Sequence, residues 1–386
     1  MKNKGPFLNP QNRSDKPTFF IVAGEASGDL HGAKLISAIK NKSPKSRFVG
    51  HGGDKMIEAG LERIIHIDRL AIMGFSEIIK HLPFMFKVMN ESLAMIQDLK
   101  PDRIILIDYP GFNLRLAKNC QSLKTPITYF ILPQLWAWKE KRIKTFRNYI
   151  DQSLSIFPFE QDWFEARGVY ANYIGHPFSE IEPPKTTKGR FYSKHKLQES
   201  DTTLVLLPGS RQQEIDRHWP ICWKTVERLR QQKPDLKVII GKAGGVEIPN
   251  NLDGATIEDK DIRAAMAFGT AALTASGTAT LECAALDIPE VVFYKLSRIS
   301  GCITNKLNKS PFAAMVNLIA GREVVQEFLQ NDATEKNLAA ALHPLLERSK
   351  ERNAVLSGYE EVRRSLGVPG VYVRAAEIIL KRTSHG

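Results

Sequence analysis

The sequence predicts an α/β protein made of two similar domains, each built on a parallel sheet, that face a cleft. Three observations lead to this fold class. The chain has 386 residues, more than one core usually holds. Apolar, β-rich runs alternate with helical patterns, which is typical of parallel sheets covered on both faces. A charged segment with two prolines, residues 180–189, interrupts this alternation, which restarts at Leu204.

Strands are predicted where short apolar runs rich in β-branched residues occur, and helical patterns fill most of the intervals between them. The predicted strands cover 18–23, 103–108, 126–132, 153–157, 171–174, 203–207, 237–240, 271–274 and 291–294.

The same pattern sets the domain boundaries. Residues 1–17 are polar and predict a flexible tail. Residues 18–180 form the first predicted domain and 190–345 the second. Because no convincing strand appears after about residue 320, the C-terminal helices of 346–386 are predicted to pack back onto the first domain.

Composition limits the class of protein. Lys and Arg number 54 against 42 Asp and Glu, a net charge of +12, which suits an acidic partner such as nucleic acid, anionic lipid or a phosphorylated substrate. The four cysteines form no Cys-x-x-Cys pair, so we expect neither a zinc site nor disulfides, and a cytoplasmic location. No signal peptide is recognised, and the longest uncharged run, 264–281, is too weakly apolar for a membrane span.

The first predicted strand ends at Gly24, where a polar loop leads into a helical pattern. Ligands of parallel sheets bind beyond the carboxyl ends of the strands. Glu25 and Asp29 would repel a pyrophosphate, so the loop favours a sugar or acceptor site over a dinucleotide site. A structural role is equally compatible, with Ser27 or Asp29 as the helix cap and Gly28 in the turn.

A second predicted strand of this domain ends in Asp108, where a general base could take a proton from an acceptor hydroxyl. The alternative is helix capping by Asp108 or Asn113. Trp136 and Trp138 precede a basic run at 139–147, and together they could hold a sugar and a phosphate. Nucleic-acid binding stays open for this run, although no helix-turn-helix, zinc-finger or RNA-binding signature accompanies it.

In the second domain a strand is followed by Pro-Gly-Ser-Arg at 208–211 and then by a helical pattern. Backbone amides at the helix start near Ser210, together with the Arg211 guanidinium, would bind phosphate. The alternative is a turn with a surface Arg–Glu pair.

The segment after the strand at 271–274 repeats this arrangement with Ser276, Gly277 and Thr278. Glu282 lies about one helical turn further on, where a carboxylate can accept both hydroxyls of a ribose. This combination favours a nucleotide-sugar donor, and the alternative is a Thr-capped buried helix. Asn317, a lone amide in an apolar run, is either a structural hydrogen-bonding residue or a base-recognition residue.

Residues 72–89 are rich in Met and Phe, with Lys and His between them. The residues alone favour a pair of packed helices. The alternative is an exposed apolar patch with a basic rim, suited to acyl chains or a membrane surface. The candidates for that surface are Met73, Phe75, Phe84, Met85 and Phe86.

Taken together, these segments resemble the lipid-A-disaccharide synthase family, membrane-associated glycosyltransferases of Gram-negative outer-membrane lipid assembly. Matching motifs occur in the same order along nearly the whole chain. They are Gly-Glu-Ala-Ser-Gly-Asp at 24–29, Met-Gly-Phe at 73–75, Ile-Asp at 107–108 with Phe-Asn at 112–113, Pro-Gln-Leu-Trp-Ala-Trp at 133–138, Phe-Pro-Phe-Glu at 157–160, Ile-Gly-His at 174–176, Leu-Pro-Gly-Ser-Arg at 207–211, Ser-Gly-Thr-Ala at 276–279 with Leu-Glu at 281–282, and Asn-Leu at 317–318 with Ala-Gly-Arg-Glu at 320–323.

The resemblance implies a glycosyltransferase B fold and transfer of 2,3-diacylglucosamine from its UDP derivative to the 6-hydroxyl of 2,3-diacylglucosamine 1-phosphate. The products would be a β-1,6-linked disaccharide 1-phosphate and UDP, formed with inversion. We expect no metal or cofactor, because no carboxylate cluster with metal-ligand spacing appears and amides with an arginine can replace a cation. The resemblance further implies an anionic membrane surface as partner, no nucleic acid, and a cytoplasmic enzyme peripherally attached to the inner membrane. A homodimer is left open.

The resemblance also assigns roles to residues. The family's essential aspartate and arginine fall on Asp108 and Arg211, and Gly111 stands where many relatives carry Asp. Glu25 or His31 would be next in line as the base. The predicted donor-binding residues are Gly209, Ser210, Arg211, Ser276, Gly277, Thr278, Glu282 and Asn317. The predicted acceptor-side residues are Gly24, Glu25, Ser27, Gly28, Asp29, Trp136 and Trp138.

Two rival functions fit part of the pattern. A UDP-N-acetylglucosamine 2-epimerase would share the two-domain architecture and the UDP site but would act on the donor alone. A basic adaptor for nucleic acid or membranes would bind in a salt-sensitive way and consume no UDP-sugar.

Overall fold

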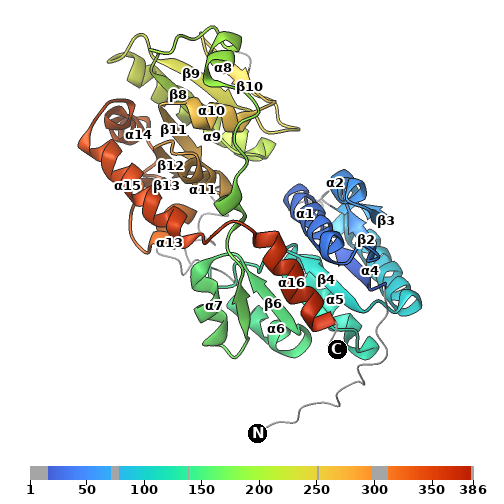
Figure 1. Ribbon diagram of the computed structural model, residues 1–386. Coiled ribbons are helices and arrows are strands. Elements are labelled where there is room, and N and C mark those ends of the chain that lie inside the picture. Colours follow the sequence, from blue (N-terminus) through green and yellow to red (C-terminus); the bar gives the residue numbers. More distant parts are fainter. Residues whose placement is uncertain (1–15, 71–77, 138, 250–251, 297–311, 384–386) are drawn as a thin grey trace. The chain divides into compact units, whose positions relative to one another are not determined.

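The computed structural model describes residues 16–70, 78–137, 139–249, 252–296 and 312–383. The chain forms two compact units. The first comprises residues 1–177 together with 368–386, and the second comprises 178–367. The chain therefore leaves the first unit once and returns to it with its last helix (Figure 1).

The first unit is built on a seven-stranded parallel sheet in the order β3-β2-β1-β4-β5-β6-β7. Its central strands are largely apolar, and Phe19 to Val22 are completely buried. The strands are β1 (Thr18–Val22), β2 (Arg47–Gly52), β3 (Leu61–His66), β4 (Arg103–Ile107), β5 (Ile127–Phe130), β6 (Gln152–Ser155) and β7 (Ala171–Tyr173).

Helices cover both faces of this sheet. One apolar core lies between the sheet and residues of α4, α5, α6 and α7, while α1 packs against α2 and α16 (Figure 1). The helices are α1 (Ala26–Lys42), α2 (Asp54–Glu58), α3 (Ile67–Leu70), α4 (Ile78–Leu99), α5 (Pro110–Asn119), α6 (Ile143–Tyr149), α7 (Pro158–Glu165) and α16 (Val371–Thr383).

The second unit holds a six-stranded parallel sheet in the order β10-β9-β8-β11-β12-β13. Side chains of Thr187, Asp261, Thr334 and Ser349 cap four of its helices. Its strands are β8 (Thr203–Leu207), β9 (Lys237–Gly241), β10 (Thr256–Glu258), β11 (Ala271–Ala275), β12 (Glu290–Tyr294) and β13 (Glu327–Leu329). Its helices are α8 (Lys188–Lys194), α9 (Gln212–Arg230), α10 (Ile262–Phe268), α11 (Thr278–Ala285), α13 (Met315–Ala320), α14 (Glu335–Leu342) and α15 (Lys350–Ser365).

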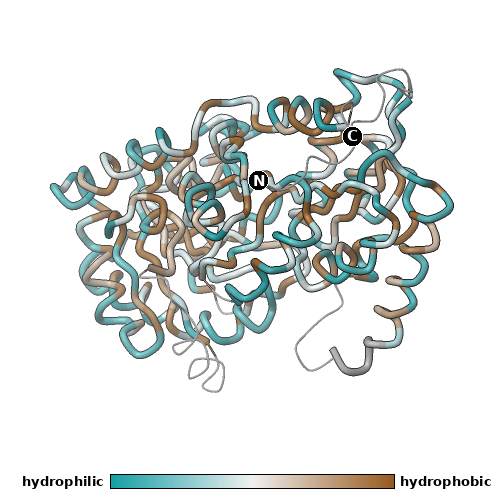
Figure 2. Tube along the Cα trace, turned by 90° about the horizontal axis from the view of Figure 1, so that it is seen from below, coloured by the Kyte–Doolittle hydropathy of each residue, from teal (hydrophilic) through white to brown (hydrophobic). Residues whose placement is uncertain are grey.

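Hydrophobic and hydrophilic residues alternate along the helices of both units (Figure 2), as expected for helices with one face on a sheet. The prediction of an α/β protein with two Rossmann-like domains is confirmed by the two parallel sheets. The predicted tail falls largely on residues 1–15, which lie outside the described residues.

Four strands were not predicted, one of them in the C-terminal region where no strand was expected. β2 was missed because its sequence holds His51 and two glycines. At Gly50 a Cβ atom would lie 2.0 Å from the carbonyl oxygen of Ile21, so only glycine fits there. β3 carries Glu62 and Arg63 directly after its first residue, and β10 and β13 have three residues each. The expectation of no strand after 320 fails at β13, which pairs with β12.

The C-terminal helices divide between the two units. α15 packs against α11 and α13 and belongs to the second unit, whereas α16 packs against α1 in the first. The prediction that 346–386 as a whole returns to the first domain is therefore wrong for α15. The reason is that α15 turns Val355, Tyr359 and Val362 into the second unit's interior.

Candidate active site

In the first unit, chemically capable side chains gather beyond the carboxyl ends of the strands. Glu25 follows β1, Asp108 follows β4 directly, Glu160 follows β6 and His176 follows β7. Trp136, which follows β5, donates from Nε1 to Oε1 of Glu160 at 3.2 Å. Because all seven strands are parallel, these side chains belong to one edge of the sheet, where α/β folds bind ligands.

Asp108 sits in a strained turn. Its φ is 41° and that of Tyr109 is 47°, both in the left-handed region that side-chain-bearing residues rarely adopt. The carbonyl oxygen of Asp108 accepts bonds from Tyr129 Oη at 2.5 Å and Asn113 Nδ2 at 2.7 Å, which hold the turn in place. Strain of this kind persists where the surroundings fix it, and it clusters at functional sites.

The environment of Asp108 changes its acidity. Burial, together with the neighbouring Glu25 carboxylate, raises the pKa of Asp108 from 3.8 to about 6. A carboxylate with this pKa is ionised at neutral pH and is a stronger base than an exposed aspartate. The role of Asp108 as general base stays a prediction, with which this pKa is consistent. Asn113, the alternative cap, instead holds the Asp108 backbone.

Glu160 is a second carboxyl group at this edge, to which the sequence analysis gave no role. It is completely buried, and its Oε2 accepts from the backbone amide of Phe157 at 3.4 Å. Burial raises the pKa of Glu160 to about 8, so it carries a proton at neutral pH. The signal was the acidic residue in Phe-Pro-Phe-Glu, which resembles an ordinary helix start.

Two neutral histidines complete the edge. Burial lowers the pKa of His31 to about 4, with a contribution from Lys34, and lowers that of His176 to about 3. His31 Nδ1 lies 2.8 Å from Tyr372 Oη of α16. The C-terminal helix thus fixes the ring of the residue predicted as an alternative base.

Several of the predicted loop residues make structural contacts, the alternative that the sequence also offered. The buried Asp29 carboxylate accepts from the amides of Gly53, Lys55 and Met56 and so caps α2. A Cβ atom at Gly24 would lie 2.3 Å from the ring of Tyr109, so this glycine allows close packing beside Asp108. The buried Gly28 faces Ala23 in the same way, at 3.2 Å. Glu25 and Ser27 are exposed, and Trp138 lies outside the described residues.

In the second unit, the turn after β8 is held by a carboxylate of its own helix. Glu214 Oε2 accepts from the amides of Ser210 at 3.0 Å and Arg211 at 3.3 Å. The amides that were predicted to bind phosphate near Ser210 are therefore occupied. The Arg211 side chain is 72% exposed and is free to reach a ligand, although it lies 3.7 Å from Glu214 Oε1.

The turn after β11 is more open. Gly277 and Thr278 are exposed at the start of α11, and a Cβ atom at Gly277 would meet nothing within 4 Å. Ser276 is engaged, because its Oγ donates to the carbonyl of Ala313. Glu282 is partly buried, and its Oε1 accepts from Arg263 Nε at 2.7 Å. Gly277, Thr278 and the α11 amides thus form the open part of the predicted donor site.

The residues alone left Asn317 open between two roles, and the resemblance placed it on the donor side. Its contacts favour the structural role instead. The side chain is completely buried. Its Nδ2 donates to Val325 O and to Glu327 Oε1, and its Oδ1 accepts from the amides of Val324 and Val325. Because both donors and both acceptor positions are used within the unit, this amide has nothing left for a base.

The predicted membrane-facing residues divide as well. Phe84 and Met85 pack against the core of the first unit, and the Arg69 guanidinium lies 5.1 Å from the Phe84 ring centroid. Phe86 is 63% exposed. Met73 and Phe75 lie outside the described residues. Helical packing therefore accounts for two of the five candidates, and an exposed role is open to Phe86.

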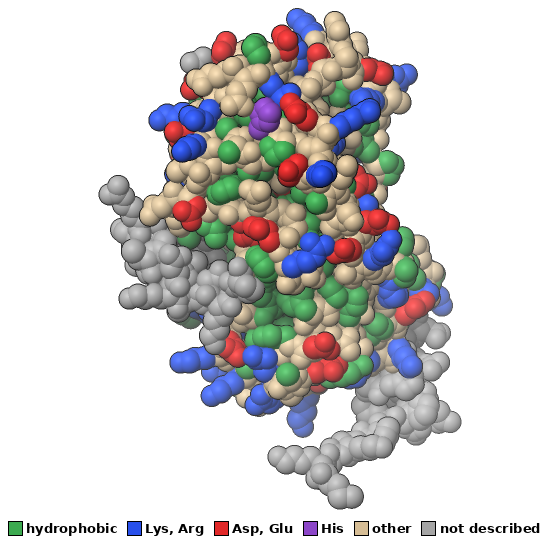
Figure 3. All heavy atoms as spheres, turned by 90° about the vertical axis from the view of Figure 1, so that its left-hand side faces the viewer, with side chains coloured by type: hydrophobic (Ala, Val, Ile, Leu, Met, Phe, Trp, Pro, Cys, Tyr) green, Lys and Arg blue, Asp and Glu red, His purple; other side chains and the backbone are tan. Residues whose placement is uncertain are grey.

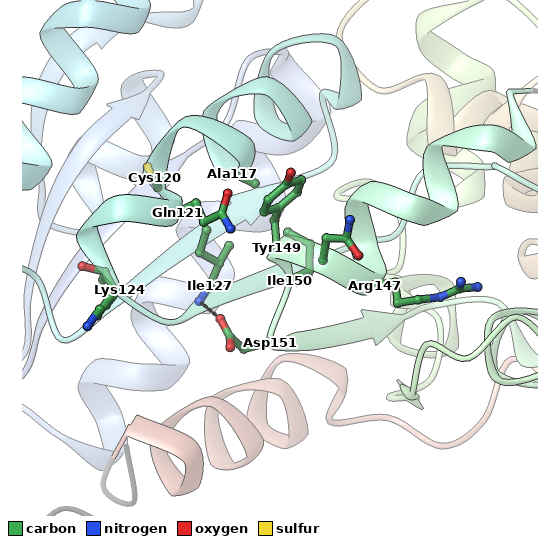
Figure 4. A pocket seen from close by; sticks show the side chains of 11 residues that line it. Ala117, Cys120, Gln121, Lys124, Ile127, Arg147, Tyr149, Ile150 and Asp151 are labelled. Atoms are coloured by element: carbon green, nitrogen blue, oxygen red, sulfur yellow. Dashed lines mark hydrogen bonds between the residues drawn. The ribbon is translucent and has the colours of Figure 1, made fainter. Parts of the chain in front are cut away.

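A pocket of about 220 Å³ in the first unit is not part of this site (Figure 4). Its lining includes Ile127, the first residue of β5, and Asp151, which precedes β6 and accepts from the Ile127 amide. It therefore lies at the amino ends of the strands, opposite Asp108.

Within the described ranges, no cluster of three His, Cys, Asp or Glu side chains has metal-binding geometry.

Charge and hydropathy add two findings. On the face shown in Figure 3, acidic side chains are interspersed among Lys and Arg, so the net charge of +12 is not one continuous patch there. Across the described part of the chain, no helix is both long and apolar enough to cross a membrane.

The profile of a family described as lipid-A-disaccharide synthetase matches residues 19–373. A lipid-A-disaccharide synthase of Acidobacterium capsulatum is 36% identical over 374 residues, covering 92% of this chain and 94% of the relative. One of Myxococcus xanthus is 35% identical over 375 residues, covering 95% and 98%.

Solved structures with low sequence identity share the fold. The glycotransferase of kitacinnamycin superposes with a TM-score of 0.63 at 14% identity, covering 95% of this chain and 99% of that one. A putative UDP-N-acetylglucosamine 2-epimerase from Listeria monocytogenes gives 0.62 at 14% identity, covering 95% of each chain. The resemblance is to glycosyltransferases of the B fold and epimerases alike, so it establishes the architecture alone.

Proposed function

Because this chain belongs to the lipid-A-disaccharide synthase family, we propose that it forms its disaccharide by one direct displacement, with Asp108 as general base and Arg211 on the leaving diphosphate. The chain is a glycosyltransferase of lipid A biosynthesis that uses a UDP-sugar donor and a phosphorylated, diacylated glucosamine acceptor.

Asp108 takes the proton from the 6-hydroxyl of 2,3-diacylglucosamine 1-phosphate. The oxygen then attacks the anomeric carbon from the face opposite UDP, so that the configuration inverts and no sugar–enzyme bond forms. The observation that carries this assignment is the Asp108 carboxylate in a fixed, strained turn, with its pKa raised to about 6.

Charge on the departing UDP is stabilised by the start of α11 at Gly277 and Thr278 and by the exposed guanidinium of Arg211. Glu282 accepts the ribose hydroxyls through the oxygen that Arg263 does not engage. Amides and arginine supply the positive charge that a cation would otherwise bring. We therefore propose a reaction that needs neither a metal nor a cofactor.

For the acceptor to be reached, the chain must work at a lipid surface. Exposed Phe86, with the neighbouring Lys87, offers an apolar side chain beside a cation, which suits the boundary of an anionic bilayer. We accordingly place the enzyme at the cytoplasmic face of the inner membrane. A homodimer stays a prediction, which sedimentation of the purified chain tests.

The deciding experiment is a mixed-micelle assay with UDP-2,3-diacylglucosamine and 2,3-diacylglucosamine 1-phosphate, in the presence of a chelator, read by mass spectrometry. The proposal expects a disaccharide 1-phosphate with a β-1,6 linkage that forms only when both lipids are present. Product that appears only after metal is restored would contradict the metal-independent mechanism. Donor consumed without acceptor would point to an epimerase or hydrolase activity.

A further inference from the structure

The turn after β8 contains a carboxylate where the sequence predicted a phosphate. Glu214 Oε2 accepts from two consecutive amides, those of Ser210 and Arg211, and its Oε1 accepts from Tyr294 Oη at 3.0 Å. The same Oε1 lies 3.7 Å from an Arg211 nitrogen. Three hydrogen bonds and one cation therefore converge on a single, largely buried side chain.

The backbone is adapted to this carboxylate. Gly209 has a φ of 138°, which L-residues rarely adopt, and a Cβ atom there would lie 2.7 Å from both Cβ and Oε2 of Glu214. The glycine thus lets the turn close over the glutamate. This requirement is separate from any approach of a ligand to the loop.

A buried histidine of the same helix, His218, also contacts this turn. His218 Nδ1 lies 2.6 Å from the carbonyl oxygen of Pro208, which can only accept, so Nδ1 carries the proton. Its Nε2 then accepts from the amide of Lys295 at 3.2 Å. α9 thereby ties the turn after β8 to the end of β12, through Glu214 to Tyr294 and through His218 to Lys295.

We propose that Glu214 is a positioning residue that fills the amide cradle of the 209–211 turn, so that this loop acts on the donor through the Arg211 guanidinium rather than through its amides. Two amides that already face a carboxylate offer little attraction to a second anion, whereas the exposed guanidinium beside them keeps unused donors. This inference rests on the proposed role of Arg211.

The test compares Glu214→Ala and Glu214→Gln with Glu227→Ala, which removes an exposed glutamate from the same helix. UDP affinity is measured by calorimetry, transfer by kcat and KM for the donor, and folding by thermal unfolding. Because the frame that aims Arg211 is lost, Glu214→Ala is expected to lower kcat/KM by about 10- to 100-fold. The glutamine should restore most of this, since its carbonyl still accepts from the amides and its NH₂ donates to Tyr294.

A double-mutant cycle separates this inference from the proposed function. If Glu214 acts through Arg211, Glu214→Ala should have little further effect on kcat/KM in an Arg211→Ala background. The inference is overturned if the two substitutions lower kcat/KM additively, or if Glu214→Ala leaves the kinetics unchanged. It is also overturned if Glu214→Ala binds UDP more tightly, which would show that the carboxylate competes with the diphosphate. An Arg211→Ala variant with normal transfer would instead refute the proposed function. Should Glu214→Ala not fold, Tyr294→Phe removes one contact and should give a smaller loss of the same kind.

Discussion

Replacing Asp108 by asparagine should inactivate the enzyme and make it more stable. Asparagine is nearly isosteric with aspartate and tolerates the left-handed backbone that Asp108 adopts, so the turn is kept. The carboxylate that we propose as the general base is lost, so turnover should fail. The folded state becomes more stable, because it no longer contains a partly buried negative charge beside the Glu25 carboxylate.

The size of the gain follows from the pKa. The pKa of Asp108 is raised from 3.8 to about 6, so the folded protein binds its proton more tightly than the unfolded chain does. Wild-type stability therefore falls as the pH rises through this interval, by about 3 kcal/mol at pH 7. At pH 5 roughly half of this difference remains. The substituted asparagine does not titrate. The gain in stability of the variant over wild type should therefore depend on pH in the same way, and about 3 kcal/mol is its upper limit at pH 7.

The assay is thermal unfolding of both proteins between pH 5 and pH 8, beside turnover measurements. For a unit of this size, 3 kcal/mol corresponds to a rise in Tm of about 6–12 °C at pH 7. Asp162→Asn, which neutralises an exposed carboxylate on α7, should leave Tm nearly unchanged. The reasoning is refuted if Asp108→Asn unfolds no later than wild type at pH 7, or if its advantage does not shrink toward pH 5. Near-normal turnover would show that the base lies elsewhere.

Three further substitutions test other parts of the site. Gly24→Ala should lower the stability by about 1–3 kcal/mol and lower kcat, since the new Cβ would lie 2.3 Å from the Tyr109 ring. Gly111→Ala is the control and should be tolerated, because its Cβ would meet nothing within 4 Å. Equal unfolding temperatures of the two variants would contradict this prediction. Gly277→Ala should fold normally but bind UDP about tenfold more weakly in calorimetry, because only a ligand would meet the added methyl group. An unchanged affinity for UDP would show that Gly277 is not part of the donor site. Phe86→Ser should reduce binding to anionic liposomes without lowering Tm, and unchanged binding would exclude this residue from a membrane surface.

The sequence by itself determined the fold class and the family. Alternating apolar runs specify parallel strands wherever a strand is buried on both faces, because such strands need continuous β-branched segments. The central strands β1, β4, β8 and β11 were accordingly predicted within a residue or two. The same pattern placed Asp108 and Gly277 at strand ends, where a parallel sheet brings its ligand-binding groups together.

Edge strands and side-chain partners needed the tertiary structure. β2 needs glycine at position 50 because the neighbouring strand leaves no room for a Cβ atom there. α15 and α16 differ in which unit buries their apolar face. The side chains of Asp29, Asn317 and Glu214 each accept hydrogen bonds from backbone amides of other segments or of the adjoining turn. Whether a polar residue binds a ligand or its own backbone depends on which partners folding brings within about 3 Å of it, and residue type and spacing along the chain do not fix that distance.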